Sequence, residues 1–379
     1  MGIEIREVTN KKMLKDFIKF GDNLYKGNPY YVPTLFIDEV NSFNREKNVN
    51  YGFAESVEYL AYKDDKIVGR ICGVINHRYN KLKDVKHLRF NHLDFIDDIE
   101  VSKALFNAIG EWGKKKGMTE FDGPMGITDL DKQGMLVDFG FDKPGMFITN
   151  YNYDYYQKHM EQLGFKTDCN WVEYYIKVPP KDDEKIARIK KISNYTLRKF
   201  GFKIIRPATK KELIDNWARP LFAIYNDAFA PLHGVTRLEQ DQIEMYIKNY
   251  FSVLDLDYIS IIADKDNNLI GVAALCPNMT VAMQKAKGRF FPFGWYHLLK
   301  GLKHPKGLDM LFVAVDPAYQ GYGVNGIMII DIIERCQENG IEFAETGPEL
   351  TDNEKVQAMW KNFDTEIIRH KRCYIKDID

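Results

Sequence analysis

The stretch VAVDPAYQGYGVNGIMIIDIIERC, from Val313 to Cys336, decides the fold of this chain. It joins an apolar, strand-like run to an amphipathic, helix-like run through a turn rich in glycine. Gly321 and Gly323 allow the backbone amides of the turn to point towards one centre, and the helix that follows adds unpaired N–H groups and the positive end of its dipole. The pattern predicts a turn that binds a diphosphate. The alternative is a glycine turn that serves only close packing.

Gly321, Gly323 and Gly326 also spell G-x-G-x-x-G, the pattern of dinucleotide-binding folds. Glu342 or Glu345, further along the chain, could hold the ribose of such a cofactor. Three features of the context argue against it. The segment DPAYQ is a long spacer before the first glycine, only 53 residues follow Gly326, and the strand comes after an antiparallel hairpin. A nicotinamide dinucleotide therefore stays the second choice of cofactor.

The composition argues against several classes of protein. The formal net charge is −1 and neither half of the chain has a long run of Lys or Arg, so we expect no nucleic-acid partner. No apolar run is long enough to cross a bilayer and the first residues contain no apolar signal core, so we expect a soluble, cytoplasmic protein without membrane contact. The five cysteines stand singly and predict no metal site: Cys72, Cys169, Cys276, Cys336 and Cys373.

Four features recur in the same order, which indicates a duplicated unit. IREVTNKK at 5–12 returns as IRPATKKE at 205–212, and each precedes a helix-like pattern. EYLAYKDDKIVGRICGVI from Glu58 is echoed by DYISIIADKDNNLIGVAALC from Asp257, and both read as antiparallel hairpins. A helix closed by Gly, a short strand and Gly-Pro then end at Pro124 and again at Pro348. Coincidence between short patterns is the alternative to duplication.

The boundary between the two copies is predicted near Pro179 and Pro180, which end a strand. Apolar residues at helical spacing follow at Ile186, Ile189 and Ile192, so residues 179–200 are predicted to form a linker helix. The expected domains are residues 1–178 and 201–379. Each is an α/β unit with a mixed, mostly antiparallel sheet that is flanked by helices.

The second unit resembles the GCN5-related N-acetyltransferases. The diphosphate loop of that family, [Q/R]-x-x-G-x-[G/A] after a strand ending in V-x-P, is matched by Val315-Asp316-Pro317 and by Gln320 onward, with Asn325 where the family has Gly or Ala. The resemblance implies an acyl-CoA cosubstrate, acetyl-CoA by default, and a strand whose backbone pairs with the pantetheine arm. The cofactor-binding residues that it implies are Phe312, Val313, Val315, Gln320, Gly321, Tyr322, Gly323, Val324, Asn325, Gly326 and Asn353.

The resemblance leaves the proton-transfer groups open. Trp360 stands where the family often has a tyrosine that protonates the leaving thiolate, and an indole N–H cannot act as an acid. Glu345, at the end of a strand, is the best candidate for a base, with Asp309 and His297 as further candidates. We expect an N-acyltransferase that acts on the primary amine of a small molecule or peptide. A non-catalytic acyl-CoA sensor is the alternative, and peptide-bridge transferases are disfavoured because their long helical arm is missing.

The first unit is predicted to keep the fold and to lose the cofactor site. Asp97, Asp98 and Glu100 crowd the start of its helix, where they cap the helix and repel a phosphate. We expect this unit to be a scaffold that walls a substrate cleft. Two segments could shape that cleft, the long loop from Gly126 and the aromatic segment GRFFPFGWYHLLKGLKHPKG from Gly288. The aromatic segment is expected to be a helix that buries its rings between the two units; an acyl pocket and a basic membrane-adhering helix are the alternatives.

Overall fold

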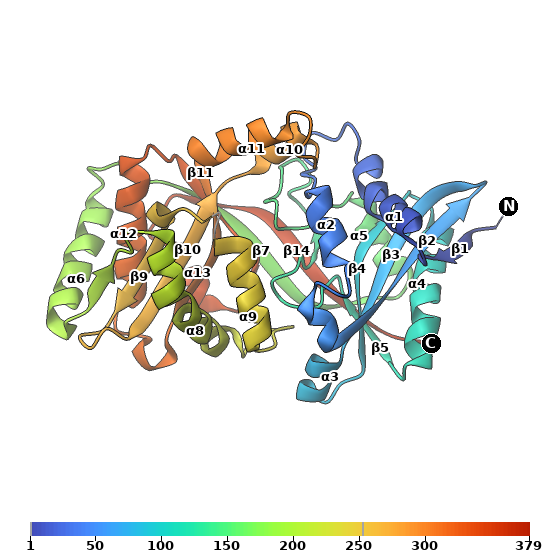
Figure 1. Ribbon diagram of the computed structural model, residues 1–379, viewed down its shortest axis with the longest axis horizontal. Coiled ribbons are helices and arrows are strands. Elements are labelled where there is room, and N and C mark those ends of the chain that lie inside the picture. Colours follow the sequence, from blue (N-terminus) through green and yellow to red (C-terminus); the bar gives the residue numbers. More distant parts are fainter. Residues whose placement is uncertain (1, 252–253) are drawn as a thin grey trace. The chain divides into compact units, whose positions relative to one another are not determined.

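Two adjacent aspartates explain the first hairpin. Asp64 and Asp65 have left-handed backbone angles, with φ of 50° and 59°, as a two-residue type I′ turn requires. They join β2 (Ala54–Lys63) to β3 (Lys66–Asn76) as an antiparallel pair. The structure is a computed structural model that describes residues 2–251 and 254–379 (Figure 1).

The chain divides into two units, and unit 1 holds residues up to Val172 together with Thr280–Leu299 and Ile368–Asp379. Its strands are β1 (Glu4–Glu7), β2, β3, β4 (His87–Phe95), β5 (Glu120–Gly123), β6 (Met135–Val137), the start of β7 (Lys166–Lys177) and most of β14 (Thr365–Asp377). Its helices are α1 (Lys11–Leu24), α2 (Phe36–Ser42), α3 (His77–Lys83), α4 (Ile99–Lys115), α5 (Tyr155–Gln162), α10 (Thr280–Ala286) and the start of α11 (Gly294–Lys303). The strand order is β1-β2-β3-β4-β5-β14, with β6 beside β14.

Unit 2 holds Glu173–Met279 and Lys300–Ile367. Its strands are the end of β7, β8 (Lys203–Ile205), β9 (Ile259–Ala263), β10 (Leu269–Pro277), β11 (Gly307–Val315), β12 (Phe343–Thr346) and β13 (Glu349–Leu350). Its helices are α6 (Glu184–Phe200), α7 (Lys210–Glu212), α8 (Arg219–Phe229), α9 (Gln240–Tyr246), α12 (Val324–Glu338) and α13 (Glu354–Trp360). The strand order is β7-β12-β11-β10-β9-β8, with β13 beside β7.

The two sheets repeat one pattern of pairing. In each, three antiparallel pairs are followed by one parallel pair, β4 with β5 in unit 1 and β11 with β12 in unit 2. A long helix connects the parallel strands, α4 in unit 1 and α12 in unit 2. The predicted fold class, two α/β units with mostly antiparallel sheets flanked by helices, is therefore confirmed.

The division into units differs from the predicted boundaries because each half of the chain gives its last strand to the other sheet. β14 pairs with β5 and β6 in unit 1, although it follows unit 2 in the sequence. The end of β7 pairs with β12 in unit 2. The predicted linker helix α6 is part of unit 2, since Ile186 packs against Ile330 and Ile333 of α12.

Each unit has its own apolar core. In unit 1, Gly69 and Gly73 on β3 allow α4 to approach closely, because a Cβ added at Gly69 would lie 2.9 Å from Leu105 Cδ1. In unit 2, α12 packs on β9 and β10 through buried residues such as Ile327 and Met328.

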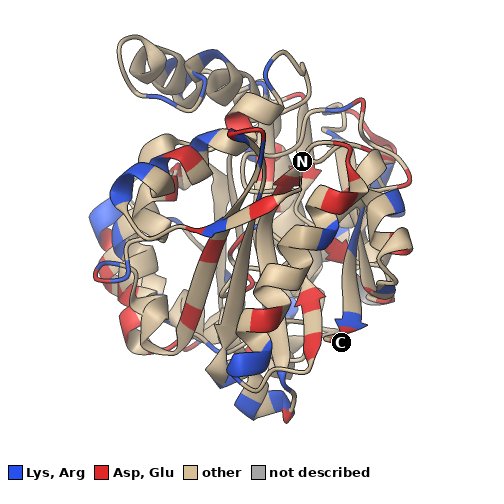
Figure 2. Cartoon of the chain, turned by 90° about the vertical axis from the view of Figure 1, so that its right-hand side faces the viewer, with Lys and Arg blue, Asp and Glu red and all other residues tan. Residues whose placement is uncertain are grey.

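Charged residues of both signs are interspersed over the face shown in Figure 2. Across the described ranges, no helix combines the length and the apolar composition that a bilayer-spanning segment needs.

Candidate functional site

Strand β11 of unit 2 has one edge that is left open over its second half. Its parallel pairing with β12 ends at Met310 and Thr346, whereas its pairing with β10 continues to Val315. Leu311 is an extra residue in the β10 pairing, where Ala274 faces Phe312 and Leu275 faces Met310. Within the described residues, the backbone from Leu311 to Val315 therefore faces no strand on the β12 side. An extended amide-bearing ligand can pair with such an edge.

The glycine turn lies between this strand and the N-terminus of α12. Gly321 and Gly323 have φ of 85° and 82°, a conformation that L side chains rarely adopt. Gly323 is the N-cap residue of α12 and has no side chain with which to cap the helix. The first N–H groups of a long helix are thus left for another acceptor, as at anion-binding helix termini.

The other predicted cofactor residues surround this turn. Gln320, Tyr322 and Asn325 are exposed, Gly326 is half-buried and Val324 is buried. On β11, Phe312 and Val313 are half-buried and Val315 is buried in the core. Asn353 lies apart from the turn in the sequence and acts as the N-cap of α13, where its Oδ1 accepts from Val356 N at 3.4 Å.

Trp360 contacts a carboxyl group that the sequence did not single out. Its Nε1 lies 3.0 Å from each carboxylate oxygen of Glu349 on β13. Burial raises the pKa of Glu349 to about 7, although hydrogen bonds from Trp360 and Thr346 oppose this shift. A carboxyl group with this pKa can both give and take a proton near neutral pH. The sequence signal is weak, since Glu349 only follows the predicted Gly-Pro.

Two of the three predicted bases lie on neighbouring strands of unit 2. Asp309 and Glu345 occupy matching positions on the parallel strands β11 and β12. Asp309 is fully buried, and Asn278 Nδ2 donates to its Oδ1 at 2.6 Å. Glu345 is half-buried, opposite Tyr175 of β7. His297 belongs to α11 in unit 1, whereas the other two belong to unit 2.

Unit 1 repeats the strand bulge but not the open helix terminus. In β4, His92 has φ of 44° and lies where the pairing with β3 changes register. The parallel pairing of β4 with β5 ends at Arg89 and Asp122. The N-cap of α4 is Asp98, whose carboxylate accepts from Glu100 N at 3.1 Å and from Lys63 Nζ at 2.8 Å. The N-terminus of α4 is thus capped by a carboxylate, which would repel a diphosphate at this position. The sequence predicted this arrangement from Asp97, Asp98 and Glu100.

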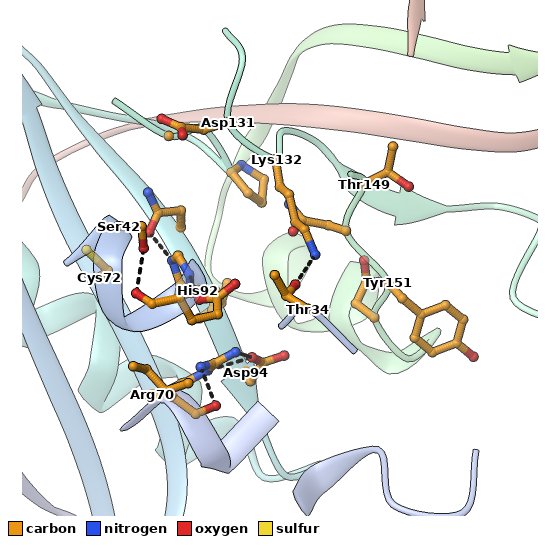
Figure 3. A pocket seen from close by; sticks show the side chains of 18 of the residues that line it. Thr34, Ser42, Arg70, Cys72, His92, Asp94, Asp131, Lys132, Thr149 and Tyr151 are labelled. Carbon is orange, nitrogen blue, oxygen red and sulfur yellow. Dashed lines mark hydrogen bonds and ion pairs between the residues drawn. The ribbon is translucent and has the colours of Figure 1, made fainter. Parts of the chain in front are cut away.

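A cavity of about 200 Å³ lies beside this bulge in unit 1 (Figure 3). It is lined by α1, α2, β3, β4 and the loop after β5, which is the long loop noted in the sequence. Its acidic, basic and histidine lining residues are Asp22, Glu39, Arg70, His92, Asp94, Asp131 and Lys132. Four carboxylates therefore face two cationic side chains and one imidazole. The sequence did not predict this cavity, because its residues come from many segments that are far apart in the sequence.

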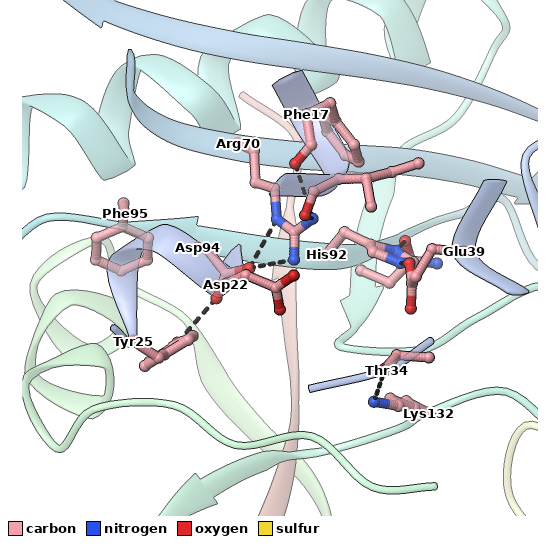
Figure 4. A network of polar contacts seen from close by, with 12 residues as sticks. Phe17, Asp22, Tyr25, Thr34, Glu39, Arg70, His92, Asp94, Phe95 and Lys132 are labelled. Atoms are coloured by element: carbon pink, nitrogen blue, oxygen red, sulfur yellow. Dashed lines mark hydrogen bonds and ion pairs between the residues drawn. The ribbon is translucent and has the colours of Figure 1, made fainter. Parts of the chain in front are cut away.

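Arg70 and Asp94 form a closed ion pair at the base of the cavity (Figure 4). Arg70 Nε and Nη2 both lie 2.7 Å from Asp94 Oδ2, and Nη1 donates to the carbonyls of Phe17 and Ile18. Tyr25 donates its hydroxyl to Asp94 Oδ1 at 2.8 Å. The hydrogen bonds hold Arg70 and Asp94 in place, and they leave little hydrogen-bonding capacity for a ligand.

Glu39 and His92 form a second pair that reaches the cavity. His92 Nε2 lies 2.9 Å from Glu39 Oε2, and His92 Nδ1 lies 2.7 Å from Asn91 Oδ1. Asn91 Nδ2 donates to Met125 O at 3.3 Å, which fixes the orientation of the amide. Both imidazole nitrogens thus lie within hydrogen-bonding distance of an oxygen. Burial opposes ionisation of Glu39, but the charge of His92 and its hydrogen bond lower the pKa of Glu39 to about 2.

Three groups of the cavity keep hydrogen-bonding capacity. Lys132 Nζ donates to Thr34 Oγ1 at 2.6 Å, its one hydrogen-bond partner among the described residues. Burial lowers the pKa of this ammonium, although Glu39 opposes the shift. Asp22 accepts from Tyr31 through Oδ1 at 2.9 Å and keeps Oδ2, just as Glu39 keeps Oε1. The cavity can therefore accept hydrogen bonds from a ligand at two carboxylates and donate one from an ammonium.

Known proteins support this reading of unit 2. Residues 219–364 match the Acetyltransferase (GNAT) family, and this range includes β11, the glycine turn and α12. The chain is 26% identical to Protein YghO of Escherichia coli (strain K12), over 99% of this chain and 95% of that one. It is 25% identical to the Bacterial ceramide synthase of Caulobacter vibrioides, over 76% of this chain and 74% of the relative.

Solved structures extend the likeness of fold to the whole chain. The tandem GNAT protein from the clavulanic acid biosynthesis pathway superposes with a TM-score of 0.57 at 10% identity, covering 100% of this chain and 99% of that one. The family match, the open strand edge and the repeated unit agree, and they assign acyltransferase chemistry in general. Residues 219–364 thus match the Acetyltransferase (GNAT) family, and the whole chain has the fold of a tandem GNAT protein, with two acetyltransferase-like units.

Proposed function

We propose that the chain moves an acyl group from acyl-coenzyme A to a primary amine, and that unit 2 holds the acyl-CoA. The observation that carries the proposal is the open edge of β11 from Leu311 to Val315, which leads through the glycine turn into the uncapped N-terminus of α12. The strand edge suits the amides of pantetheine and the helix terminus suits the diphosphate.

The nature of the acyl group is the next part of the proposal. The resemblance to the acetyltransferase family made acetyl-CoA the default donor. One relative is named Bacterial ceramide synthase, and a ceramide is an amide between a fatty acyl group and a long-chain amino alcohol. We therefore place a long-chain acyl-CoA and an amino alcohol beside acetyl-CoA as the first substrates to test.

The reaction forms a C–N and an S–H bond and breaks a C–S and an N–H bond. The deprotonated amine attacks the thioester carbonyl, the C–N bond forms, the C–S bond breaks, and the proton lost by the amine ends on the departing thiolate. Glu349 can deliver that proton in place of the tyrosine that Trp360 replaces, because its pKa of about 7 keeps part of it protonated at neutral pH.

The cavity of unit 1 suits the amine. Its lining has more carboxylates than cationic groups, so a ligand with one positive charge balances the cavity better than an anion. Glu39 Oε1 and Asp22 Oδ2 can accept from an ammonium, while Lys132 Nζ can donate to a neighbouring hydroxyl. These are the groups that an amino alcohol presents together.

The test is the release of free CoA thiol from acetyl-CoA and palmitoyl-CoA with 2-amino-1-alcohols of increasing chain length. We expect amine-dependent release and an amide product by mass spectrometry, and calorimetric binding of the amine to the unit 1 cavity that Glu39→Gln weakens by about tenfold or more. A matched control is Glu46→Gln on the exposed surface of unit 1. Release that does not depend on the amine would contradict a transferase.

A second candidate is a non-catalytic acyl-CoA-binding protein. It is favoured by Trp360, which stands in the place of the family tyrosine. The indole N–H of Trp360 donates its hydrogen bond to Glu349. Calorimetric binding of acyl-CoA without turnover on any amine would support this candidate over the transferase.

A further inference from the structure

The aromatic segment, residues 289–303, presents its rings to solvent. Large exposed fractions are found at Phe290 (42%), Phe291 (79%), Phe293 (70%), Trp295 (45%), Tyr296 (53%) and Leu299 (49%). The sequence favoured a helix that buries these rings between the two units, and that burial stays a prediction; unit 1 itself does not cover them. Six large apolar side chains within ten residues form a patch that a soluble monomer rarely exposes without a function.

The residues that precede the aromatic segment are held to unit 1 by hydrogen bonds. Thr280 Oγ1 donates to Gly145 O at 3.1 Å, and Gln284 Nε2 donates to Pro29 O at 2.7 Å. The backbone carbonyl of Gly288 accepts from Phe36 N at 2.9 Å. All of these contacts lie within unit 1. The patch therefore begins directly after a fixed point, at the top of Figure 1, where α10 and α11 are drawn in orange.

One side of α11 faces the protein and the other faces solvent. Gly294 and Leu298 are buried, whereas Trp295, Tyr296 and Leu299 are exposed. Trp295 Nε1 donates to Pro292 O at 3.1 Å, so the ring has a fixed place in the turn that precedes the helix. The exposed side of α11 is thus one continuous, ordered apolar surface and not a set of scattered apolar residues.

The charge around this patch has one sign. Residues 280–303 contain no Asp or Glu, in a chain whose acidic and basic residues otherwise almost balance. Five basic residues lie in this range, all exposed: Lys285, Lys287, Arg289, Lys300 and Lys303. Lys300 and Lys303 are on the same helix as Trp295. Apolar rings with Trp and Tyr among them, edged by lysines, are the composition of helices that lie in a membrane interface.

We propose that residues 289–303 dock the protein on an anionic lipid surface. Phe291 and Phe293 enter the apolar boundary of the bilayer, Trp295 and Tyr296 sit at the level of the headgroups, and Lys300 and Lys303 bind lipid phosphates. A protein partner with an apolar groove would not need the uniform positive charge, which is why a lipid surface is the better match. This inference replaces the expectation of no membrane contact and stands apart from the proposed acyl transfer.

The experiment is flotation of the full-length protein with vesicles of phosphatidylcholine alone or mixed with phosphatidylglycerol. The wild-type protein is expected to float with the mixed vesicles, less with the neutral ones, and less again at high salt. Phe291→Ser with Phe293→Ser should lower the partition coefficient by at least about tenfold. Lys300→Gln with Lys303→Gln should lower it by about tenfold on the mixed vesicles only.

Two matched pairs serve as controls on other surfaces. Ile192 and Tyr195 of α6 are exposed to 59% and 57%, and their double change to Ser should leave flotation unaltered. Lys114→Gln with Lys115→Gln on α4 should also leave it unaltered. No flotation of the wild-type protein, or equal flotation of the phenylalanine variant, overturns the proposal. Sedimentation equilibrium completes the test, since self-association that the phenylalanine variant abolishes, without vesicle binding, would assign the patch to a second copy of the chain.

Discussion

Glu349 is a single residue through which pH acts on the stability of unit 2. Burial raises its pKa to about 7, well above its ordinary value of 4.5, so the folded protein binds this proton more tightly than the unfolded chain does. The stabilisation is fully present below about pH 4.5 and is lost as the pH rises through about 7. The free energy of unfolding should therefore fall over this window by up to roughly 3 kcal/mol from this group.

Glu349→Gln keeps the shape of the side chain and removes the titration. Urea unfolding at about pH 5 and about pH 8 measures the effect. We expect the loss of stability between these pH values to be smaller in the variant than in the wild-type protein by roughly 1–3 kcal/mol. An equal loss in both proteins would show that Glu349 is ionised in the folded state.

Residues differ in how far the sequence reveals them. Gly321 and Gly323 could be predicted because a turn with left-handed backbone angles needs glycine, and the structure gives them φ of 85° and 82°. Glu349 could not be predicted, since its pKa depends on burial and on Trp360, eleven residues away. Whether the predicted cofactor residues bind acyl-CoA stays a prediction.

At the scale of elements, strands β3 and β4 are joined to α1 by one buried ion pair. Arg70 and Asp94 lie on paired strands, and Arg70 also donates to two carbonyls of α1. Removing one partner of a buried pair leaves the other charge without compensation.

Asp94→Asn should therefore lower the free energy of unfolding by about 3 kcal/mol or more. Arg70→Leu with Asp94→Leu should cost less than the sum of the two single changes to Leu. Denaturant unfolding of the single and double variants measures both. The exposed bidentate pair of Arg219 and Glu244 gives the control, since Glu244→Gln should cost less than about 1 kcal/mol. Equal costs at the two sites would contradict the role given to the buried pair.

Elements with a strong local signal could be predicted, and those that depend on partners could not. The hairpin of β2 and β3 follows from the turn at Asp64 and Asp65. The helix α6 was predicted from Ile186, Ile189 and Ile192. Its packing on α12 was not predicted, because the spacing of apolar residues shows which face of a helix is buried but not which element covers that face. The aromatic segment was predicted to bury its rings between the two units, which stays a prediction; unit 1 by itself leaves Phe291 exposed to 79%.

At the scale of the whole molecule, the last strand of the chain belongs to the sheet of unit 1. β14 pairs with β5 and β6, and its residues Cys373 and Tyr374 are buried in unit 1. A fragment of residues 1–178 lacks this strand and should not fold into a stable domain, because β5 and β6 would lose their shared neighbour.

Circular dichroism with urea unfolding tests the fragment against the full-length protein. We expect no cooperative transition for residues 1–178 alone, and recovery of one when residues 179–379 are co-expressed. A stable, cooperatively unfolding fragment would contradict the exchange of strands.

Duplication could be predicted from the sequence because short motifs return in the same order, and the strand orders of the two sheets agree with it. The exchange of β7 and β14 could not be predicted, since two equivalent strands carry no signal for which copy they join. The cavity of unit 1 was missed for a related reason, because Glu39, His92 and Lys132 converge only in three dimensions.

The central claim is that the turn at Gly321 holds the diphosphate of acyl-CoA, and calorimetric titration with CoA tests it. Gly321→Ala and Gly340→Ala both place a Cβ in open space at a left-handed position, with φ of 85° and 69°, so each should cost about 1–2 kcal/mol of stability. We predict that the wild-type protein and Gly340→Ala bind CoA alike, and that Gly321→Ala binds at least about tenfold more weakly. No binding to the wild-type protein, or equal affinity in all three, would contradict the claim.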